Sequence, residues 1–158
     1  MEYLITTKHD KRIISIDDLS VSKWWVDASY AVHNEMKSQT GAIMKMGKGA
    51  LFTKVSKQKL NSRSSTEAEL VAVHDVMPQV LWTRYFLEEQ GYKADTSVVY
   101  QDSKSAILLE ENGRASSGQR TRHINIRYFF VKDRITSKEV KMEYCPTDEM
   151  IGDFLLNH

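Results

Sequence analysis

Three strand patterns follow one another closely in the first part of the chain, and the hydrophobic period then changes to that of a helix. The strand patterns cover Trp24–Tyr30, Gln39–Lys45 and Ala50–Lys54, and Met46–Gly49 has the composition of a turn between the second and the third. Strands joined by such short connections pair as antiparallel neighbours. The sequence therefore predicts a three-stranded antiparallel meander at the start of the fold.

A long amphipathic helix is predicted directly after the meander. Beyond Ser64, apolar residues recur with the spacing of one buried helix face. They are Leu70, Val73, Val76 and Met77. Pro78 is expected to kink this helix, and the apolar pattern resumes at Leu81 and continues to Gly91.

Helices alternate with two short strands in the rest of the chain. The expected elements are a strand over 97–100, a helix over 103–111, a helix over 123–135, a strand over 140–144 and a helix over 147–156. Hairpin strands followed by alternating helices and strands form a mixed sheet flanked by helices, so we expect an α/β fold. Residues 1–22 are weakly patterned, and Ile13, Ile14 and Ile16 suggest a short strand or a leader.

The composition is that of one globular domain and excludes several classes of protein. Hydrophobic types make up 41% and charged types 27% of the 158 residues. The net charge of +1 favours no particular class of binding partner. The longest apolar runs have four residues, too short for a membrane span or a signal peptide. The single Cys145 excludes an internal disulfide and a cysteine-based zinc site, and we expect it to be buried. Trp24, Trp25 and Trp82 have apolar neighbours and are expected in the core.

Four acidic residues are placed where this layout can bring them together. Asp27 and Asp102 end two strands, and the carboxyl ends of parallel neighbours form a ligand-binding crevice. Glu69 lies in the first turns of the long helix, and Asp153 lies in the expected last helix. Clustered carboxylates favour a hard cation such as Mg²⁺, and two such ions about 4 Å apart can clamp a phosphodiester. Strand-end aspartates also form turns and cap helices, so spacing alone leaves both interpretations open.

Seven short blocks occur in an order that resembles one known family. The blocks are Trp25–Tyr30, Ser56–Lys59, Ser64–Leu70, Tyr100–Ala106, Arg122–Phe130, Tyr144–Thr147 and Ile151–Phe154. Together they resemble the ribonuclease H domain of copia-type retrotransposon polyproteins, from about residue 24 onward. Residues 1–22 resemble the end of the reverse transcriptase region. The resemblance thus divides the chain into a leader, 1–22, and a ribonuclease H-like domain, 23–158.

The resemblance implies a ribonuclease H-like fold, which is a five-stranded mixed sheet with helices on both faces. It implies an endonuclease that uses two Mg²⁺ ions, with Mn²⁺ as a substitute, to cut the RNA strand of an RNA–DNA hybrid. The family's catalytic metal ligands correspond to Asp27, Glu69, Asp102 and Asp153. The implied partners are the hybrid and the reverse transcriptase region of the same polyprotein, with no membrane. The implied location is intracellular, in a cytoplasmic virus-like particle or in the nucleus.

Two departures from the family pattern leave other functions open. Ser103 stands where the family usually has Asn, and both residue types cap helices. The family also continues past its last acid with a Thr-Lys-Pro segment, whereas this chain ends with Leu155–His158. A second hypothesis is therefore an inactive remnant or domesticated domain that binds nucleic acid or protein without cutting. A third is a DNA strand-transfer enzyme of the integrase type, but such enzymes usually place their glutamate last, and Glu69 lies between two aspartates.

Two stretches of the chain, Ala50–Arg63 and Gly113–Arg127, contain basic residues and no acidic ones. Local positive charge lets a nuclease of near-zero net charge hold nucleic-acid backbones, although charge runs are ordinarily solvated surface. His123 is expected either to contact phosphate or to cap its helix. The candidate substrate-binding residues are Ser29, Lys57, Lys59, Arg63, Ser103, Arg120, Arg122 and His123.

Two glutamates near the start of the long helix compete for one role. Ser64-x-x-Glu67 has the form of a capping box, in which Ser64 is the N-cap and Glu67 reaches back to its backbone amide. Thr66-x-x-Glu69 has the same form, so the sequence offers two helix starts. Glu69 flanks the apolar stripe and lies about 200° around the helix axis from Glu67. We therefore predict that Glu69, and not Glu67, faces Asp27.

Overall fold

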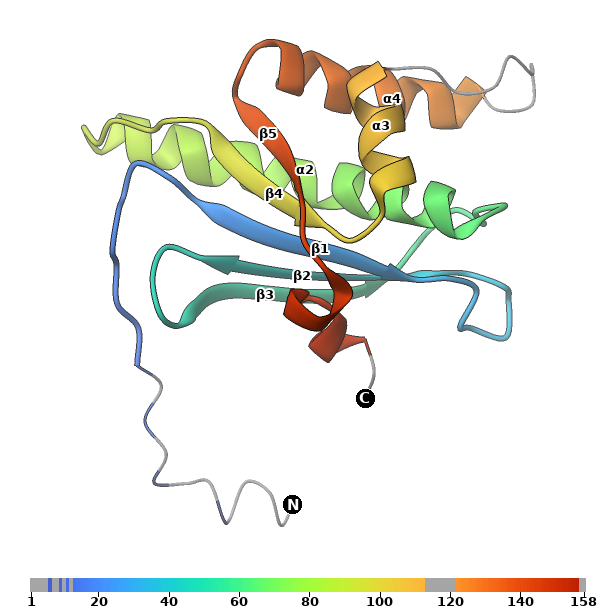
Figure 1. The fold of residues 1–158 in the computed structure, drawn as a ribbon, viewed down its shortest axis with the longest axis horizontal. Coiled ribbons are helices and arrows are strands. Elements are labelled where there is room, and N and C mark those ends of the chain that lie inside the picture. The colour runs from blue at the N-terminus through green and yellow to red at the C-terminus, as the bar shows by residue number, and fades with distance from the viewer. Residues whose placement is uncertain (1–5, 7–8, 10, 12, 113–121, 157–158) are drawn as a thin grey trace.

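Five strands form one mixed sheet at the centre of the molecule (Figure 1). The computed structural model describes residues 6, 9, 11, 13–112 and 122–156. The strands are β1 (Lys23–Ser29), β2 (Gln39–Lys45), β3 (Ala50–Lys57), β4 (Ser97–Gln101) and β5 (Val140–Tyr144). Their order is β3-β2-β1-β4-β5; the β1–β2 and β2–β3 pairs are antiparallel, and the β1–β4 and β4–β5 pairs are parallel. The predicted meander and the mixed sheet are therefore confirmed.

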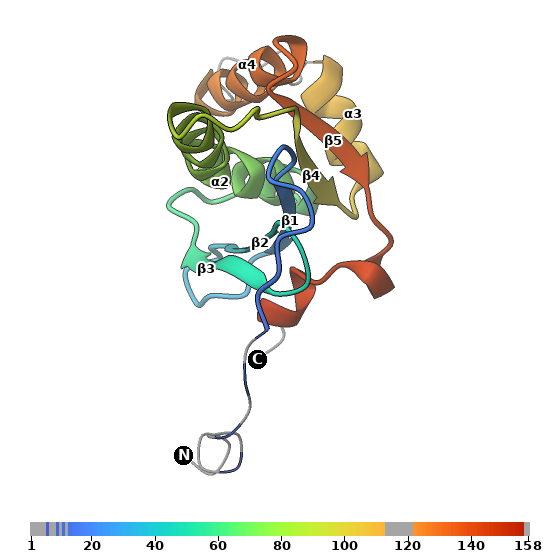
Figure 2. The same ribbon diagram turned by 90° about the vertical axis from the view of Figure 1, so that its left-hand side faces the viewer.

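Three helices lie on one face of this sheet (Figures 1 and 2). They are α2 (Ser65–Glu89), α3 (Lys104–Asn112) and α4 (Arg122–Thr136). α2 packs against β1 and β2, whereas α3 and α4 pack against β5 and against each other. α2 runs through Pro78 as one continuous element, so the proline does not divide it. Within the described ranges, no helix is both long and apolar enough to cross a membrane.

The start of α2 is fixed by two reciprocal hydrogen bonds. Ser64 is the N-cap, and its Oγ accepts a hydrogen bond from the backbone N–H of Glu67 at 3.2 Å. The Glu67 Oε2 accepts one from the backbone N–H of Arg63 at 2.7 Å. The sequence prediction of Ser64 as N-cap is confirmed, but the carboxylate bonds to the amide one residue before the cap. Because Glu67 is engaged there, Glu69 is left as the glutamate on the sheet side.

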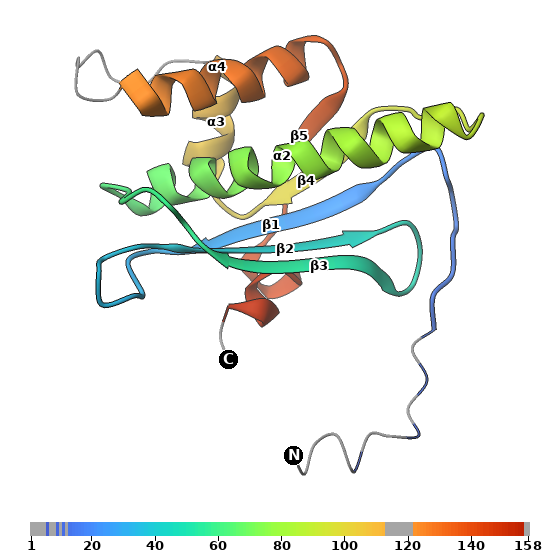
Figure 3. The same ribbon diagram turned by 180° about the vertical axis from the view of Figure 1, so that it is seen from behind.

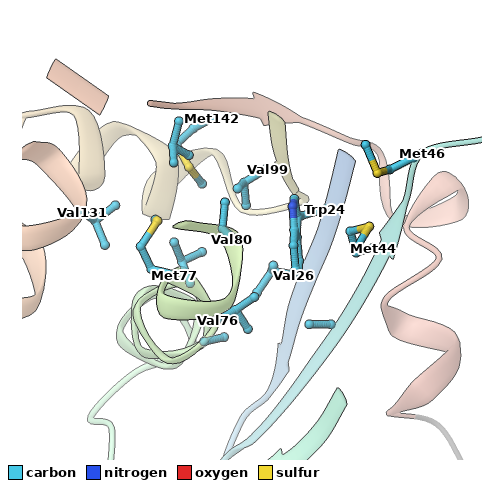
Figure 4. Packing of buried hydrophobic residues seen from close by; sticks show 14 of the residues in the cluster. Trp24, Val26, Met44, Met46, Val76, Met77, Val80, Val99, Val131 and Met142 are labelled. Atoms are coloured by element: carbon cyan, nitrogen blue, oxygen red, sulfur yellow. The ribbon is translucent and has the colours of Figure 1, made fainter. Parts of the chain in front are cut away.

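The main hydrophobic core fills the space between α2 and the sheet (Figure 4). The indole of Trp24 is fully buried in it, and its Nε1 donates to Ser22 Oγ at 3.0 Å, so the one polar atom of the ring is satisfied. This packing holds the first turns of α2 across the end of β1. The other labelled core residues are Val26, Met44, Met46, Val76, Met77, Val80, Val99, Val131 and Met142.

Two of the three tryptophans differ from the sequence prediction of core positions. Trp82 is 58% exposed and stacks on Phe86, with ring centroids 5.2 Å apart. The reason is helical phase, because the residues of α2 that face the sheet near this point are Val80, Thr83 and Leu87. Trp25 is half-buried and stacks on Tyr100 of the neighbouring strand, at 4.9 Å. Trp24 and Cys145 are buried as predicted.

The C-terminal segment forms two short turns in place of the predicted helix over 147–156. These are the 3₁₀ turns η2 (Thr147–Glu149) and η3 (Asp153–Leu155), and Figure 3 shows them on the side of the sheet opposite to α2. Gly152 separates the turns, and glycine lowers helix stability. A Cβ added at Gly41 of β2 would lie 2.9 Å from Leu156 Cγ and 3.2 Å from the Gly152 carbonyl oxygen. The missing side chain of Gly41 therefore lets the turns lie directly on β2.

Residues 13–22, the continuous described stretch before β1, form no strand, although the isoleucines in it suggested one. Ile13, Ile14 and Ile16 are 70%, 51% and 52% exposed. The backbone N–H of Asp17 donates to the Met46 carbonyl at 2.8 Å, so this segment crosses the turn between β2 and β3. A Cβ at Gly47 would lie 1.9 Å from the Ser15 carbonyl oxygen, and one at Gly49 would lie 2.4 Å from that of Ile13. The two turn glycines permit this close backbone crossing.

Candidate active site

Three carboxyl groups meet at the carboxyl ends of β1 and β4. Asp27 lies near the end of β1, Asp102 directly follows β4, and Glu69 lies in the first turns of α2. One ligand oxygen from each of the three lies within 4.8 Å of the others. Asp27 and Glu69 are buried, at 8% and 6% exposure, whereas Asp102 is half-buried. The parallel pairing of β1 with β4 explains why residues 75 positions apart meet, because neighbouring parallel strands end at the same edge.

Hydrogen bonds hold these carboxyl groups in place. The backbone N–H of Ala28 donates to Asp27 Oδ1 at 2.9 Å and contacts Glu69 Oε1 at 3.3 Å. The Thr147 hydroxyl donates to Asp102 Oδ2 at 3.0 Å. The second oxygen of Glu69, Oε2, is buried and has no hydrogen-bond partner among the described residues. A buried carboxyl oxygen without a donor is an unsatisfied acceptor that a bound cation would satisfy.

Burial and mutual repulsion shift the pKa values of two of these groups. Burial, reinforced by the charge of Asp102, raises the pKa of Asp27 to about 6. Burial and the charge of Asp27 raise the pKa of Glu69 to about 9. Each shift means that this site disfavours ionised carboxylates, first because it is buried and second because the carboxylates lie next to one another. Three clustered carboxyl groups with one unsatisfied oxygen fit a hard divalent cation such as Mg²⁺, which prefers oxygen ligands.

Asp153 lies beside this cluster without joining it. Its charge contributes to the raised pKa of Asp27, so the two side chains are near each other. The three ligand atoms within 4.8 Å come from the other acids, and in the described part of the chain Asp153 lies outside that set. The turn that carries it is held by close packing, since a Cβ at Gly152 would lie 3.4 Å from Asp27 Cβ. The structure thus brings together three of the four predicted acids and places the fourth next to them.

The predicted substrate-binding residues of the first basic stretch are only partly available. The ammonium of Lys57 pairs with Glu35 at 3.0 Å, and Glu35 also pairs with Lys37 at 3.2 Å. Lys59 and Arg63 are exposed near the start of α2. Lys57 is therefore paired with an acid of the connection between β1 and β2, whereas Lys59 and Arg63 stay exposed to solvent.

The second basic stretch falls largely outside the described residues. Arg120 lies outside them, and so do the side chains of Arg122 and His123, although these two residues begin α4. Arg127 is described, and its guanidinium pairs with Asp75 of α2 at 2.9 Å and contacts His74. Arg127 therefore joins two helices.

The two serines among the candidates have different places. The Ser103 hydroxyl accepts a hydrogen bond from the backbone N–H of Ala106 at 3.3 Å and so caps α3, as its residue type predicts. Ser29 ends β1 and is half-buried.

Thr147 is a site residue that sequence reasoning did not assign. It lies in a block quoted for the family resemblance, but no role was attached to it there. The available signal was topological, because Pro146 and Thr147 follow β5, whose carboxyl end lies beside that of β4. A hydroxyl placed there can reach Asp102, and it does.

The stability of the metal-free protein is expected to fall as pH rises. The folded-state pKa values of Asp27 and Glu69, about 6 and about 9, lie above those of unfolded carboxyl groups. Unfolding therefore releases protons, and the free energy of unfolding decreases from about pH 4 to about pH 9. Thermal unfolding followed by circular dichroism should show a lower Tm at about pH 9 than at about pH 6, and added Mg²⁺ should restore it. Glu69→Gln should flatten the upper part of the profile; a wild-type Tm that stays constant over this range would contradict the assignment.

Comparison of sequences links the chain to transposon polyproteins. It is 32% identical over 136 residues to the retrovirus-related Pol polyprotein from transposon TNT 1-94 of Nicotiana tabacum, covering 85% of the chain and 10% of that protein. It is 30% identical over 119 residues to the retrovirus-related Pol polyprotein from transposon RE1 of Arabidopsis thaliana, covering 75% of the chain and 8% of that protein. It is 27% identical over 129 residues to the Ty1-JR2 Gag-Pol polyprotein of Saccharomyces cerevisiae, covering 82% of the chain and 7% of that protein. The chain thus spans a tenth or less of these relatives. No protein-family model matches it.

Comparison of structures shows the ribonuclease H fold. The LC11-RNase H1, isolated from compost by a metagenomic approach, superimposes with a TM-score of 0.61 at 12% identity, covering 86% of this chain and 92% of that one. The solution structure of the PFV RNase H domain superimposes with a TM-score of 0.54 at 15% identity, covering 85% of this chain and 88% of that one. The expected ribonuclease H-like fold is therefore confirmed, with one correction. Among the described residues, the helices α2, α3 and α4 lie on one face of the sheet and not on both, and the opposite face carries the short turns η2 and η3. Taken together, the sequence relatives are Pol polyproteins of plant and yeast transposons and the structural neighbours are ribonuclease H domains, so this chain has the ribonuclease H fold and is similar to a part of copia-type retrotransposon Pol polyproteins.

Proposed function

We propose that this chain is a Mg²⁺-dependent endonuclease that cuts the RNA strand of RNA–DNA hybrids during reverse transcription of a retrotransposon. The observation that carries the proposal is the set of three carboxyl oxygens within 4.8 Å at the carboxyl ends of β1 and β4. Such an arrangement on a ribonuclease H fold supplies what a two-metal phosphodiesterase needs. When bound, two Mg²⁺ ions would activate the attacking water and stabilise the departing 3′ oxygen.

The residues of the site have distinct roles in this proposal. Asp27, Glu69 and Asp102 would hold the ions, with Asp153 as a further ligand at the edge of the cluster. The backbone N–H of Ala28 orients Asp27, and Thr147 orients Asp102 through its hydroxyl. Because the positions of these donors are fixed by the sheet and by the C-terminal turns, the carboxylates are positioned before substrate binds.

The hybrid substrate is supported by a structural neighbour. A crystal structure of LC11-RNase H1 in complex with an RNA/DNA hybrid superimposes with a TM-score of 0.59 at 9% identity, covering 85% of this chain and 92% of that one. In our proposal the exposed Lys59 and Arg63, together with Arg120, Arg122 and His123, contact the hybrid backbone. Binding by such contacts releases counterions and is therefore expected to weaken as salt increases.

The proposal also includes the rest of the polyprotein. Residues 1–22 would be the end of the reverse transcriptase region and 23–158 the nuclease domain, since the relatives are much longer Pol polyproteins. The reverse transcriptase region of the same polyprotein would be the second partner. We place the complex inside the cell, in a cytoplasmic virus-like particle or in the nucleus.

Incubation with an end-labelled RNA–DNA hybrid tests the proposal directly. Cleavage of the RNA strand is expected with Mg²⁺ or Mn²⁺ and is expected to stop with EDTA, while double-stranded DNA and single-stranded RNA stay intact. The Asp102→Asn variant is the matched negative control. Binding of the hybrid without cleavage would instead favour an inactive binding module. The position of Asp153 outside the three-acid set is the observation that favours this alternative. Cleavage of DNA would favour a strand-transfer enzyme.

A further inference from the structure

A fully buried carboxyl group lies behind the acidic site and is not one of its ligands. Glu110, in α3, has no exposed surface, and the same is true of Gln101, the last residue of β4. Carboxyl groups are almost never buried completely unless they are paired. Within the described ranges, no ion pair involves Glu110. Its burial therefore needs another explanation.

The partner of Glu110 is the side-chain amide of Gln101. The two carboxyl oxygens lie 3.0 and 3.3 Å from one end of that amide. The other end of the amide lies 3.4 Å from the backbone carbonyl oxygen of Glu69. The amide thus bridges a carboxyl group in α3 and the backbone of α2 at a residue of the acidic cluster.

Gln101 is connected to the site on its other sides as well. It directly precedes Asp102 in the chain, and its backbone carbonyl accepts a hydrogen bond from Cys145 N–H at 2.8 Å. Cys145 lies two residues before Thr147, whose hydroxyl holds Asp102. One buried glutamine therefore contacts or adjoins the segments that carry Glu69, Asp102 and Thr147.

We propose that Glu110 is a positioning residue of the acidic site, acting through Gln101 to fix Asp102 and Glu69 relative to each other. This inference rests on the nuclease function proposed above. Glu110 reaches neither substrate nor metal in this role; it is a hydrogen-bond partner for the Gln101 amide, and both side chains are fully buried. Without Glu110, the end of the Gln101 amide that faces α3 would be a buried polar group with no partner, and the amide would change its orientation.

The burial of Glu110 favours the uncharged form of its carboxyl group in the hydrogen bond to Gln101. Burial raises the pKa of Glu110 well above its ordinary value, with a smaller contribution from Glu111. A neutral carboxyl group can donate its proton to the Gln101 carbonyl oxygen while the Gln101 amide N–H donates to Glu69 O. Glutamine at position 110 can make the same donation, so charge is not required for the link.

Three variants separate positioning from simple packing. Glu110→Met keeps the length of the side chain but removes its hydrogen bonds, whereas Glu110→Gln keeps them. Glu111→Met is the control, because Glu111 is the exposed neighbour in the same helix turn. Three quantities are measured on the full chain: the Mg²⁺ concentration that gives half of the Mg²⁺-induced rise in Tm, and the kcat and KM of hybrid cleavage.

Glu110→Met is expected to raise the half-saturating Mg²⁺ concentration about tenfold and to lower kcat by a similar factor, with KM nearly unchanged, as for other residues that orient metal ligands. Glu110→Gln and Glu111→Met should stay close to wild type. Folded Glu110→Met with wild-type Mg²⁺ response and kcat would overturn the inference, and so would an equal loss in Glu110→Gln. If Glu110→Met does not fold, Gln101→Met breaks the same link from β4 and must show the same loss.

The wild-type protein separates this inference from the proposed function. If it shows neither hybrid cleavage nor a Mg²⁺-induced rise in Tm, the proposed function itself is wrong. If it shows both, and the Glu110 and Gln101 variants behave like wild type, only the positioning role is wrong.

Discussion

Asparagine in place of Asp27 or Asp102 is expected to lower the rate of hybrid cleavage by at least about a thousandfold. Each substitution keeps the shape of the side chain and removes a negative charge from the three-acid cluster. Bound metal ions supply several kcal/mol of transition-state stabilisation, and each 1.4 kcal/mol corresponds to about a tenfold change in rate. Single-turnover cleavage of a labelled hybrid, at saturating Mg²⁺ for the wild type, measures the loss.

The same variants should remain folded. Burial already raises the pKa of Asp27 to about 6, so a neutral amide at this position should not lower the Tm of the metal-free protein. Asp148→Asn, at an exposed acid in η2, is the matched control and should cut at the wild-type rate. If a folded Asp27 or Asp102 variant also cuts at that rate, the cluster is not the metal site.

The second large effect is a loss of cleavage that distinguishes Glu69 from Glu67, two residues earlier in the same helix. Glu69→Gln is expected to eliminate Mg²⁺-dependent cleavage, because its buried carboxyl oxygens face Asp27 and one of them is unsatisfied. The metal-free Tm should stay equal or rise at neutral pH, since the raised pKa of Glu69 means that the folded state disfavours its charge. Cleavage assays and thermal unfolding of the same preparation measure both quantities.

Glu67→Gln is the matched control for this experiment. Its side chain accepts a hydrogen bond from the Arg63 amide, and glutamine can accept the same bond. Activity should therefore be kept, and the free energy of unfolding should decrease by at most about 1 kcal/mol, the size of a capping interaction. An active Glu69→Gln beside an inactive Glu67→Gln would show that the metal ligand had been assigned to the wrong residue.

The elements that could be predicted are those whose signal lies within a few neighbouring residues. The strands β1, β2 and β5 and the helix α2 follow from hydrophobic periods, and Ser64 as N-cap follows from one side chain and the amide three residues on. The choice of Glu69 over Glu67 was also local, because rotation about one helix axis decides which side chain flanks the buried stripe.

Features that depend on a partner from elsewhere in the chain were not visible in the sequence. Lys57 appeared free to bind substrate, but Glu35 of another loop pairs with it. Arg127 appeared to belong to a basic surface, but Asp75 of α2 pairs with it. An ion pair needs two side chains that the fold brings together, and a short stretch of sequence contains only one of them.

The sequence by itself determined the order along the chain of the elements from β1 to β5, the capped start of α2 and the acids at the strand ends, because hydrophobic period and helix capping depend on neighbouring residues. Only the tertiary structure decided which of those acids meet. The parallel pairing of β1 with β4 brought Asp27 and Asp102 together, and packing of α2 added Glu69. Docking of the C-terminal turns over Gly41 left Asp153 beside the cluster. Distances of a few ångströms between residues far apart in the chain are set by strand order and side-chain packing, and those depend on the whole fold at once.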